Sequence, residues 1–232
     1  MTLLTLIQGA CDRMGLARPA AVFSSTNQEV RELLGVAQEE GLQLSRRCDW
    51  QEITKEKTFT SLAQETQTAM VPSDLDRFVA ETFWNRTRRR PFRGPVTAQE
   101  WQQIKAWTTS PVPEIFRHRG SNILIQPVPT AGHTFAYEYV STQWCESSGG
   151  TDQSAWAADT DVGLLPERLM MLGVVWRFKA MKSFPFETDY QVYESQVQQA
   201  MLRNKPQRTL DLAMGERRRI PGIVVQDGDW AI

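Results

Sequence analysis

The sequence lacks the patterns that mark a metal site or a disulfide framework. Its 232 residues include only three cysteines and two histidines. Cys11, Cys48 and Cys145 are far apart and form no Cys-x-x-Cys pair, which favours reduced, buried thiols. Neither His118 nor His133 has a His, Cys or carboxylate at metal-ligand spacing. We therefore expect no metal and no cofactor, and a surface or strand position for both histidines.

A long apolar segment and an excess of one charge are missing too. No stretch reaches the roughly 18 uninterrupted apolar residues of a membrane span, and the first residues lack the basic start of a signal peptide. Lys and Arg number 26 against 27 for Asp and Glu, so no global charge draws the chain to nucleic acid or to an anionic membrane. We expect a protein that is made in the cytosol, has no membrane partner and makes any phosphate contact locally.

Signatures of catalysis are absent as well. The sequence has no Gly-x-Ser-x-Gly elbow, no P-loop and no Gly-x-Gly-x-x-Gly turn. A hydrolase would need convergent titratable groups in a pocket, and no such group is recognisable. Asp74 with Asp76, and Asp152 with Asp159 and Asp161, are typical of helix caps or solvated turns, with calcium or magnesium binding as the alternative. We expect no catalytic residue and interpret the protein as structural.

Tryptophan, by contrast, is abundant, with eight residues in the chain. Its large apolar area and its polar N–H group suit interfaces as well as cores. The middle of the chain holds Trp84, Trp101, Trp107, Trp144 and Trp156. We favour core packing for this surplus, with contact to a partner as the alternative.

Helical periodicity marks the first part of the chain. Apolar residues from Leu3 to Met14 recur at helical spacing, and Gly15 provides a stop. Thr26 with Glu29 forms a capping-box pattern that opens a second, longer amphipathic stretch. The sequence therefore predicts two N-terminal helices, the second ending near residue 50.

Two more helices are predicted after residue 163. Pro166 suits a first helical position, and apolar residues surround most of the helix that follows, which predicts a central, buried helix. Pro185 ends it. A last helix is predicted over residues 188–203, with Tyr193 and Val197 on its apolar face.

Short strands dominate the middle of the chain. Pro, Gly and polar breaks separate short β-forming runs, and we expect the last three of them, at 114–117, 122–126 and 133–140, to form an antiparallel meander. Thr97 with Glu100 predicts one capped helical start inside it. The predicted strands are 53–59, 68–71, 79–85, 114–117, 122–126 and 133–140; residues 73–78 are predicted as one helical turn and residues 146–162 as a loop.

These elements predict an α+β fold. We expect residues 1–50 and 163–205 to form a helical bundle, residues 51–162 a β-rich insertion, and residues 206–232 an extended C-terminal arm.

The predicted arm carries the clearest sign of a docking function. It combines a basic run, a strand-forming triplet and an apolar end, which suits pairing along the edge of another protein. The alternative is that it folds back on its own domain. The residues predicted to dock are Arg217, Arg218, Arg219, Ile220, Ile223, Val224, Val225, Trp230 and Ile232.

A second basic run lies inside the insertion. Its members are Arg86, Arg88, Arg89, Arg90 and Arg93. Such a run can contact DNA phosphate or an acidic partner, whereas the alternative is a solvated loop that pairs with local carboxylates. Because no recognition helix or stacking platform accompanies it, we expect no sequence-specific binding.

Four short stretches, taken in order, resemble the head-to-tail adaptor, or connector, proteins of tailed bacteriophages. In that family a similar Trp closes the second helix, a similar Pro-x-Asp turn follows the first strands, and a similar Pro-led helix pairs with the last one. In this sequence the stretches are residues 46–50, 71–77, 165–167 and 188–193.

The resemblance implies a ring, usually a dodecamer, that lies below the portal in the neck of the virion. Its arms would grip the portal protein, its other face would receive tail or nozzle proteins, and genomic DNA would pass through the channel. Another neck or tail-completion protein, or a DNA-contacting module that uses the arginine run, are the alternatives.

Overall fold

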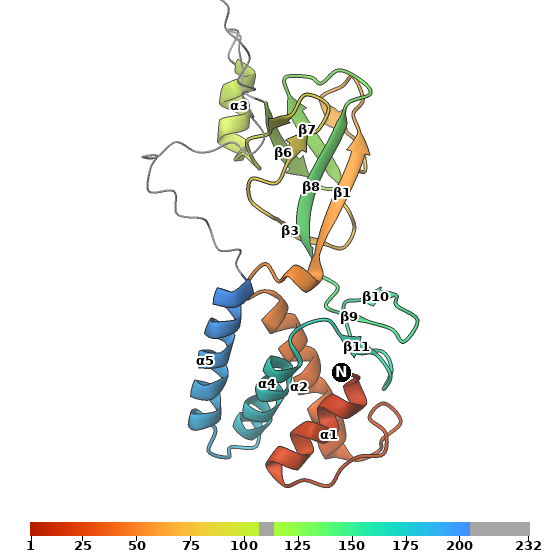
Figure 1. The fold of residues 1–232 in the computed structure, drawn as a ribbon, viewed down its shortest axis with the longest axis vertical. Helices are drawn as coiled ribbons and strands as arrows, with labels where there is room; N and C mark the ends of the chain where they lie inside the picture. Colours follow the sequence, from red (N-terminus) through yellow and green to blue (C-terminus); the bar gives the residue numbers. More distant parts are fainter. Residues whose placement is uncertain (107–113, 205–232) are drawn as a thin grey trace, which may run out of the picture.

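The molecule has two parts at opposite ends of its long axis. The computed structural model describes residues 1–106 and 114–204. Helices gather at one end and strands at the other, and the chain passes between the two parts near residues 50 and 142 (Figure 1). The N- and C-terminal helices pack together and the strands lie between them in sequence, which confirms the predicted α+β fold.

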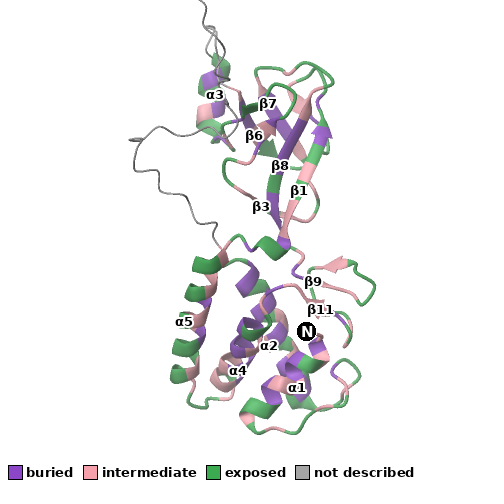
Figure 2. Cartoon of the chain, in the orientation of Figure 1, coloured by how far each residue is buried: buried purple, intermediate pink, exposed green. Residues whose placement is uncertain are grey.

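Four helices form the part that we call the helical body. They are α1 (Leu3–Met14), α2 (Gln28–Ser45), α4 (Glu167–Met181) and α5 (Glu187–Asn204). The central one is α4, which packs against each of the other three. Apolar residues on nearly all of its sides are buried, among them Leu169, Val174 and Phe178 (Figure 2). The predicted central, buried helix is thus confirmed.

The helix ends show where local polar groups replace missing backbone partners. α2 begins after Asn27, whose side chain accepts a hydrogen bond from Glu29 N at 2.9 Å, so the predicted cap at Thr26 is wrong by one residue. Trp50 closes the same helix, because its indole Nε1 donates to Leu44 O at 2.7 Å. Pro166 is the residue before α4 rather than its first helical position.

Strands β1 to β8 and helix α3 form the part that we call the β insertion. Antiparallel β1 and β8 pair along their whole lengths, and β3 and β4 also pair with β8. A second sheet has the order β2-β7-β6. The bounds are β1 (Thr54–Thr60), β2 (Thr66–Gln67), β3 (Leu75–Phe78), β4 (Trp84–Asn85), β5 (Arg90–Pro91), α3 (Ala98–Ala106), β6 (Ile115–Arg119), β7 (Asn122–Gln126) and β8 (Thr134–Ser141).

Aromatic rings fill the core of the β insertion. The ring of Phe83 lies 4.4 Å from that of Phe116 and 4.7 Å from that of Phe92, between centroids. Tyr137, on the inward face of β8, lies 5.1 Å from the ring of Phe78 on β3. Such edge-to-face and offset contacts add to the stabilisation that burial of the rings provides.

Several local predictions inside the β insertion need correction. The hairpin around Gly120 and the long strand at 134–141 are confirmed. The predicted meander of these three strands is wrong, because β8 pairs with β1, β3 and β4 in a different sheet from β6 and β7. Residues 73–78 form a turn and then β3, not a helical turn, because Phe78 pairs with Tyr139 and packs in the aromatic core. Residues 68–71 form no strand, and in residues 79–85 only Trp84 and Asn85 pair as one.

The segment after β8 packs against the helical body. The predicted loop at 146–162 contains a small sheet of β9 (Cys145–Glu146), β10 (Asp152–Gln153) and β11 (Val162–Gly163). Gln38 of α2 holds it through two hydrogen bonds to the backbone of Trp156. The ring of Trp144 lies over Gly41 of α2, where an added Cβ would come within 2.4 Å.

Most of the described tryptophans in the middle of the chain pack in a core. Trp101, Trp144 and Trp156 are buried, whereas Trp84 is only partly so. Trp107 lies outside the described residues.

Candidate functional site

The predicted docking arm lies outside the described residues. The last described residue before it, Asn204, makes defined contacts. α5 ends at Asn204, directly before the predicted arm. The side chain of Asn204 binds the connection between α2 and β1, because Nδ2 donates to Asp49 O at 2.7 Å and Oδ1 accepts from Gln51 N at 3.2 Å. Nearly three turns earlier on α5, Glu194 pairs with Arg47. α5 therefore ends where the helical body meets the β insertion.

A second set of contacts joins β3 to the same connection. Arg77 Nε lies 2.8 Å from Asp49 Oδ1, and its Nη1 lies 2.6 Å from Asp76 Oδ2. Its Nη2 donates to Cys48 O at 2.6 Å. A guanidinium with several fixed partners orders a backbone better than a single ammonium does. The connection that follows α2, the C-terminal end of α5 and strand β3 thus form one hydrogen-bonded unit, which we call the junction.

Lys55 on β1 lies at the centre of a second polar cluster. Its Nζ lies 2.9 Å from Asp74 Oδ2, 2.7 Å from Asp152 Oδ2 and 2.8 Å from Gln143 Oε1. Partial burial alone would raise the pKa of Asp74, but hydrogen bonds from Lys55 and Ser141 outweigh it and lower that pKa. Two of the predicted carboxylate positions, Asp74 and Asp152, therefore serve here as partners of a lysine.

The arginine run occupies the tip of the β4–β5 hairpin and the strand that follows. Arg86 pairs with Glu56 at 2.8 Å, Arg93 with Glu100 at 2.5 Å, and Arg88 Nη1 lies 3.8 Å from Glu114 Oε1. In the described part of the chain Arg89 and Arg90 form no ion pair, and both are exposed. Local carboxylates thus neutralise part of the run and leave its tip positive.

A fully buried carboxyl group lies in the helical body. Glu40 of α2 is fully buried and accepts hydrogen bonds from Arg177 Nε of α4 and Tyr193 OH of α5, each at 2.7 Å. Burial raises the pKa of Glu40 in spite of both donors. Gly173 makes room for this carboxyl, since a Cβ there would lie 2.0 Å from Glu40 Cδ. One carboxyl group thus ties three helices together.

The remaining candidate residues are in strands and turns. His118 lies against the ring of Phe78, and Nδ1 of His133 lies 3.4 Å from Asn85 Nδ2. Asp161 accepts from the backbone of residues 157 and 158, and Asp159 from that of residues 22 and 23. Within the described ranges no three His, Cys, Asp or Glu residues gather as metal ligands do, and no helix there is long and apolar enough to cross a membrane.

A family model described as SU10 adaptor protein matches residues 1–221. The chain belongs to the SU10 adaptor protein family. This is a family of phage head-to-tail adaptors, so the protein is a structural component of a bacteriophage. No curated protein matches the chain. The match includes the basic part of the predicted docking arm of this adaptor, at Arg217, Arg218, Arg219 and Ile220.

The four stretches that resemble head-to-tail adaptors have structural roles in this adaptor. Residues 46–50 and 71–77 supply Asp49 and Arg77 of the junction, and Asp74 beside Lys55. Residues 165–167 start α4, and Tyr193, at the end of the fourth stretch, reaches Glu40. These stretches build the joint between the two parts and the centre of the helical body.

Sequence reasoning missed two residues of this adaptor that the structure singles out. Glu40 falls on the buried stripe of α2 with Ala37, Gly41 and Leu44, so a carboxylate at an apolar position of the helical repeat was an available signal. Asn204 had no such signal, because its partners lie some 150 residues earlier in the chain.

Proposed function

We propose that this adaptor assembles as a ring, a dodecamer as the resemblance implies, below the portal in the neck of the virion. The C-terminal arm docks on the portal protein, and the opposite face of the ring receives tail or nozzle proteins around the DNA channel. Membership of the adaptor family supports a role between head and tail. The arm's role is supported by the basic run and the strand-forming triplet of its sequence, and by Asn204, the last described residue before it, which is bound to the junction.

Removal of residues 206–232 tests the arm. The shortened chain should lose binding to the portal protein of the same phage, and its thermal unfolding midpoint, measured beside that of the full chain, reports whether the fold is kept. A pull-down with purified portal measures the loss. Replacing Arg208, outside the predicted docking residues, with Ala is the matched control, and Arg217, Arg218 and Arg219 are replaced together in the test variant. Unchanged portal binding after the deletion would rule out docking by the arm.

Another position in the neck or tail is the first alternative. A tail-completion protein would use the same contact chemistry on a different surface. Separate mixing of the full chain with portal and with tail proteins distinguishes the two, because an adaptor binds the portal in the absence of the tail. Binding only to tail components would favour the alternative.

Contact of the arginine run with DNA is a second candidate, favoured by Arg89 at the hairpin tip and Arg90 at the start of β5, which form no ion pair with any described residue. Each phosphate neutralised contributes about −0.9 to the slope of log affinity against log salt. Replacing both residues with Gln should make that slope shallower by roughly 2 on duplex DNA. Arg86→Gln is the control, since Glu56 already occupies Arg86. An affinity that does not respond to salt would reject DNA contact.

A further inference from the structure

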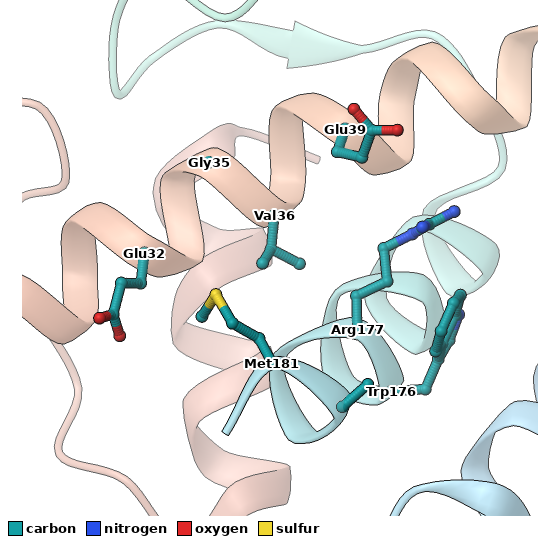
Figure 3. Close-up of a pocket in the computed structure, with 8 residues that line it drawn as sticks. Glu32, Gly35, Val36, Glu39, Trp176, Arg177 and Met181 are labelled. Atoms are coloured by element: carbon teal, nitrogen blue, oxygen red, sulfur yellow. The ribbon is translucent and has the colours of Figure 1, made fainter. Parts of the chain in front are cut away.

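An apolar groove runs between α2 and α4 on the surface of the helical body (Figure 3). Its volume is about 440 Å³. Gly35 is exposed, and a Cβ added there would meet no atom within 4 Å, so this stretch of α2 is open to close approach. Met181 is 48% exposed beside it. The lining residues are Glu32, Gly35, Val36, Glu39, Trp176, Arg177, Ala180 and Met181.

The edges of the groove on α2 are acidic. Glu32 is paired with Lys182 at 2.5 Å. Glu39 is exposed, and among the described residues it accepts only from Gln43 Nε2, at 2.7 Å. A partner for the groove therefore needs an apolar centre and a nearby cation.

The turn between α1 and α2 of the helical body presents an exposed apolar side chain, Phe23, with a cation, Arg31, nearby. Phe23 is 43% exposed, whereas its neighbour Val22 is buried. The carboxylate of Asp159 accepts from Val22 N at 3.0 Å and from Phe23 N at 2.9 Å, which fixes the turn. A turn whose backbone is already fixed loses little backbone conformational entropy when it binds.

Charge next to Phe23 is opposite to that of the groove. Arg31 is exposed and forms no ion pair in the described ranges, and its Nε donates to Ser25 O on the same turn at 3.3 Å. On α2, therefore, a cation lies toward the Phe23 turn, whereas Glu32 and Glu39 lie toward the groove.

The turn and the groove lie toward different edges of the body. Gln8 of α1 donates to Pro19 O at the start of the turn. Trp176 of the groove contacts α5, with its ring 5.0 Å from that of Tyr190. α1 and α5 occupy opposite edges of the helical body (Figure 1). One copy can therefore offer its turn to a neighbour on one side and its groove to a neighbour on the other.

We propose that the groove between α2 and α4 receives the Phe23 turn of a second copy of this chain. Two different patches in contact make a heterologous interface, which repeats from subunit to subunit until it closes a ring. Phe23 is the apolar anchor of that interface, and Arg31 lies near Glu39 of the neighbour. This inference rests on the proposed ring and names the surfaces that build it.

A disulfide between the two surfaces tests the contact directly. The full chain carrying both Phe23→Cys and Gly35→Cys is oxidised mildly in the presence of the portal protein, and the products are separated without reductant. A head-to-tail contact links each copy to the next, so the double variant should give a ladder of multimers, and a mixture of the two single variants should give heterodimers. Each single variant alone should give no ladder. The unsubstituted chain controls for Cys11, Cys48 and Cys145.

A pair of substitutions at one position provides a second measurement. Gly35→Trp fills the groove and should abolish self-association, whereas Gly35→Ala adds one methyl group to open space and should leave it unchanged. Analytical ultracentrifugation and electron microscopy on portal particles report both. Rings that form without any ladder would overturn the Phe23 contact and leave the proposed ring intact. Absence of rings on the portal for the unsubstituted chain would overturn the proposed function itself.

Discussion

The helical body and the β insertion achieve a fixed structure by different means. The body buries a carboxylate with its partners Arg177 and Tyr193, and two glycines allow side chains of neighbouring elements to approach closely. The insertion buries aromatic rings and keeps ion pairs such as Arg86 with Glu56 on its surface. Both regions bury an apolar core, but the body adds a buried ion pair to it, whereas the insertion adds contacts among aromatic rings. Each region should respond to substitution in its own way.

The largest difference should appear when one arginine is removed from each region. Arg177→Ala removes the cation that pairs with the buried Glu40, and it should lower the free energy of unfolding by about 3–5 kcal/mol. Arg86→Ala removes an exposed ion pair and should cost no more than about 1 kcal/mol. Urea unfolding measures both. Equal costs would show that the buried pair does not distinguish the body.

Two glycines of α2 provide the next comparison. Gly41→Ala places a methyl group 2.4 Å from the ring of Trp144 and should cost about 1–3 kcal/mol. Gly35→Ala meets nothing and should stabilise the helix by up to about 1 kcal/mol, since Ala is the better helix former. Thermal and urea unfolding of the two variants should move in opposite directions. A neutral Gly41→Ala would contradict the close packing between α2 and Trp144.

A cap in the β insertion should have a smaller effect. Thr97 Oγ1 accepts from Glu100 N at 3.2 Å at the start of α3, which carries the buried Trp101. Thr97→Ala should cost about 1 kcal/mol. Thr97→Ser keeps the hydroxyl and serves as the control, with stability close to that of the unsubstituted chain. A cost shared by both variants would point to the lost methyl group instead of the cap.

The smallest expected effect is a change in the pH dependence of stability. Glu40 has a folded-state pKa above 4.5, so its contribution is fully present below 4.5 and falls as pH rises through the folded-state pKa. Asp74 has a folded-state pKa below 3.8, so its contribution is present above 3.8 and is lost as pH falls through the folded-state pKa. Relative to the unsubstituted chain, Glu40→Gln should therefore gain stability as pH rises and Asp74→Asn should lose it. Slopes of the same sign in urea unfolding from pH 3 to pH 7 would contradict the assignment.

The helices could be predicted from sequence because their signals are local. Apolar residues at helical spacing and stops such as Gly15 and Pro185 gave α1, α2, α4 and α5 close to their observed bounds. The hairpin of β6 and β7 was equally local, since Gly120 adopts a positive φ of 59° at its turn. In contrast, β3 depends on Tyr139 and Val140 of β8, which are distant in sequence. Its short polar stretch resembles a helical turn when taken alone.

The candidate site was harder to predict because its contacts cross the chain. The arginine run could be found in the sequence, but its partners Glu56, Glu100 and Glu114 could not. The junction joins Asp49, Arg77 and Asn204, which no spacing rule connects. The docking arm stays a prediction, because its residues lie outside those that the structure describes.

The pairing of β1 with β8 has a consequence for how this protein could evolve. Thr54, where the β insertion begins, lies opposite Val140, where it ends, so the chain leaves and re-enters the helical body at neighbouring points. A segment with adjacent ends can be lengthened, exchanged or excised with little strain on its host, as with domains grafted into a loop. The insertion can thus change in length or in sequence without displacing the helices that surround its ends.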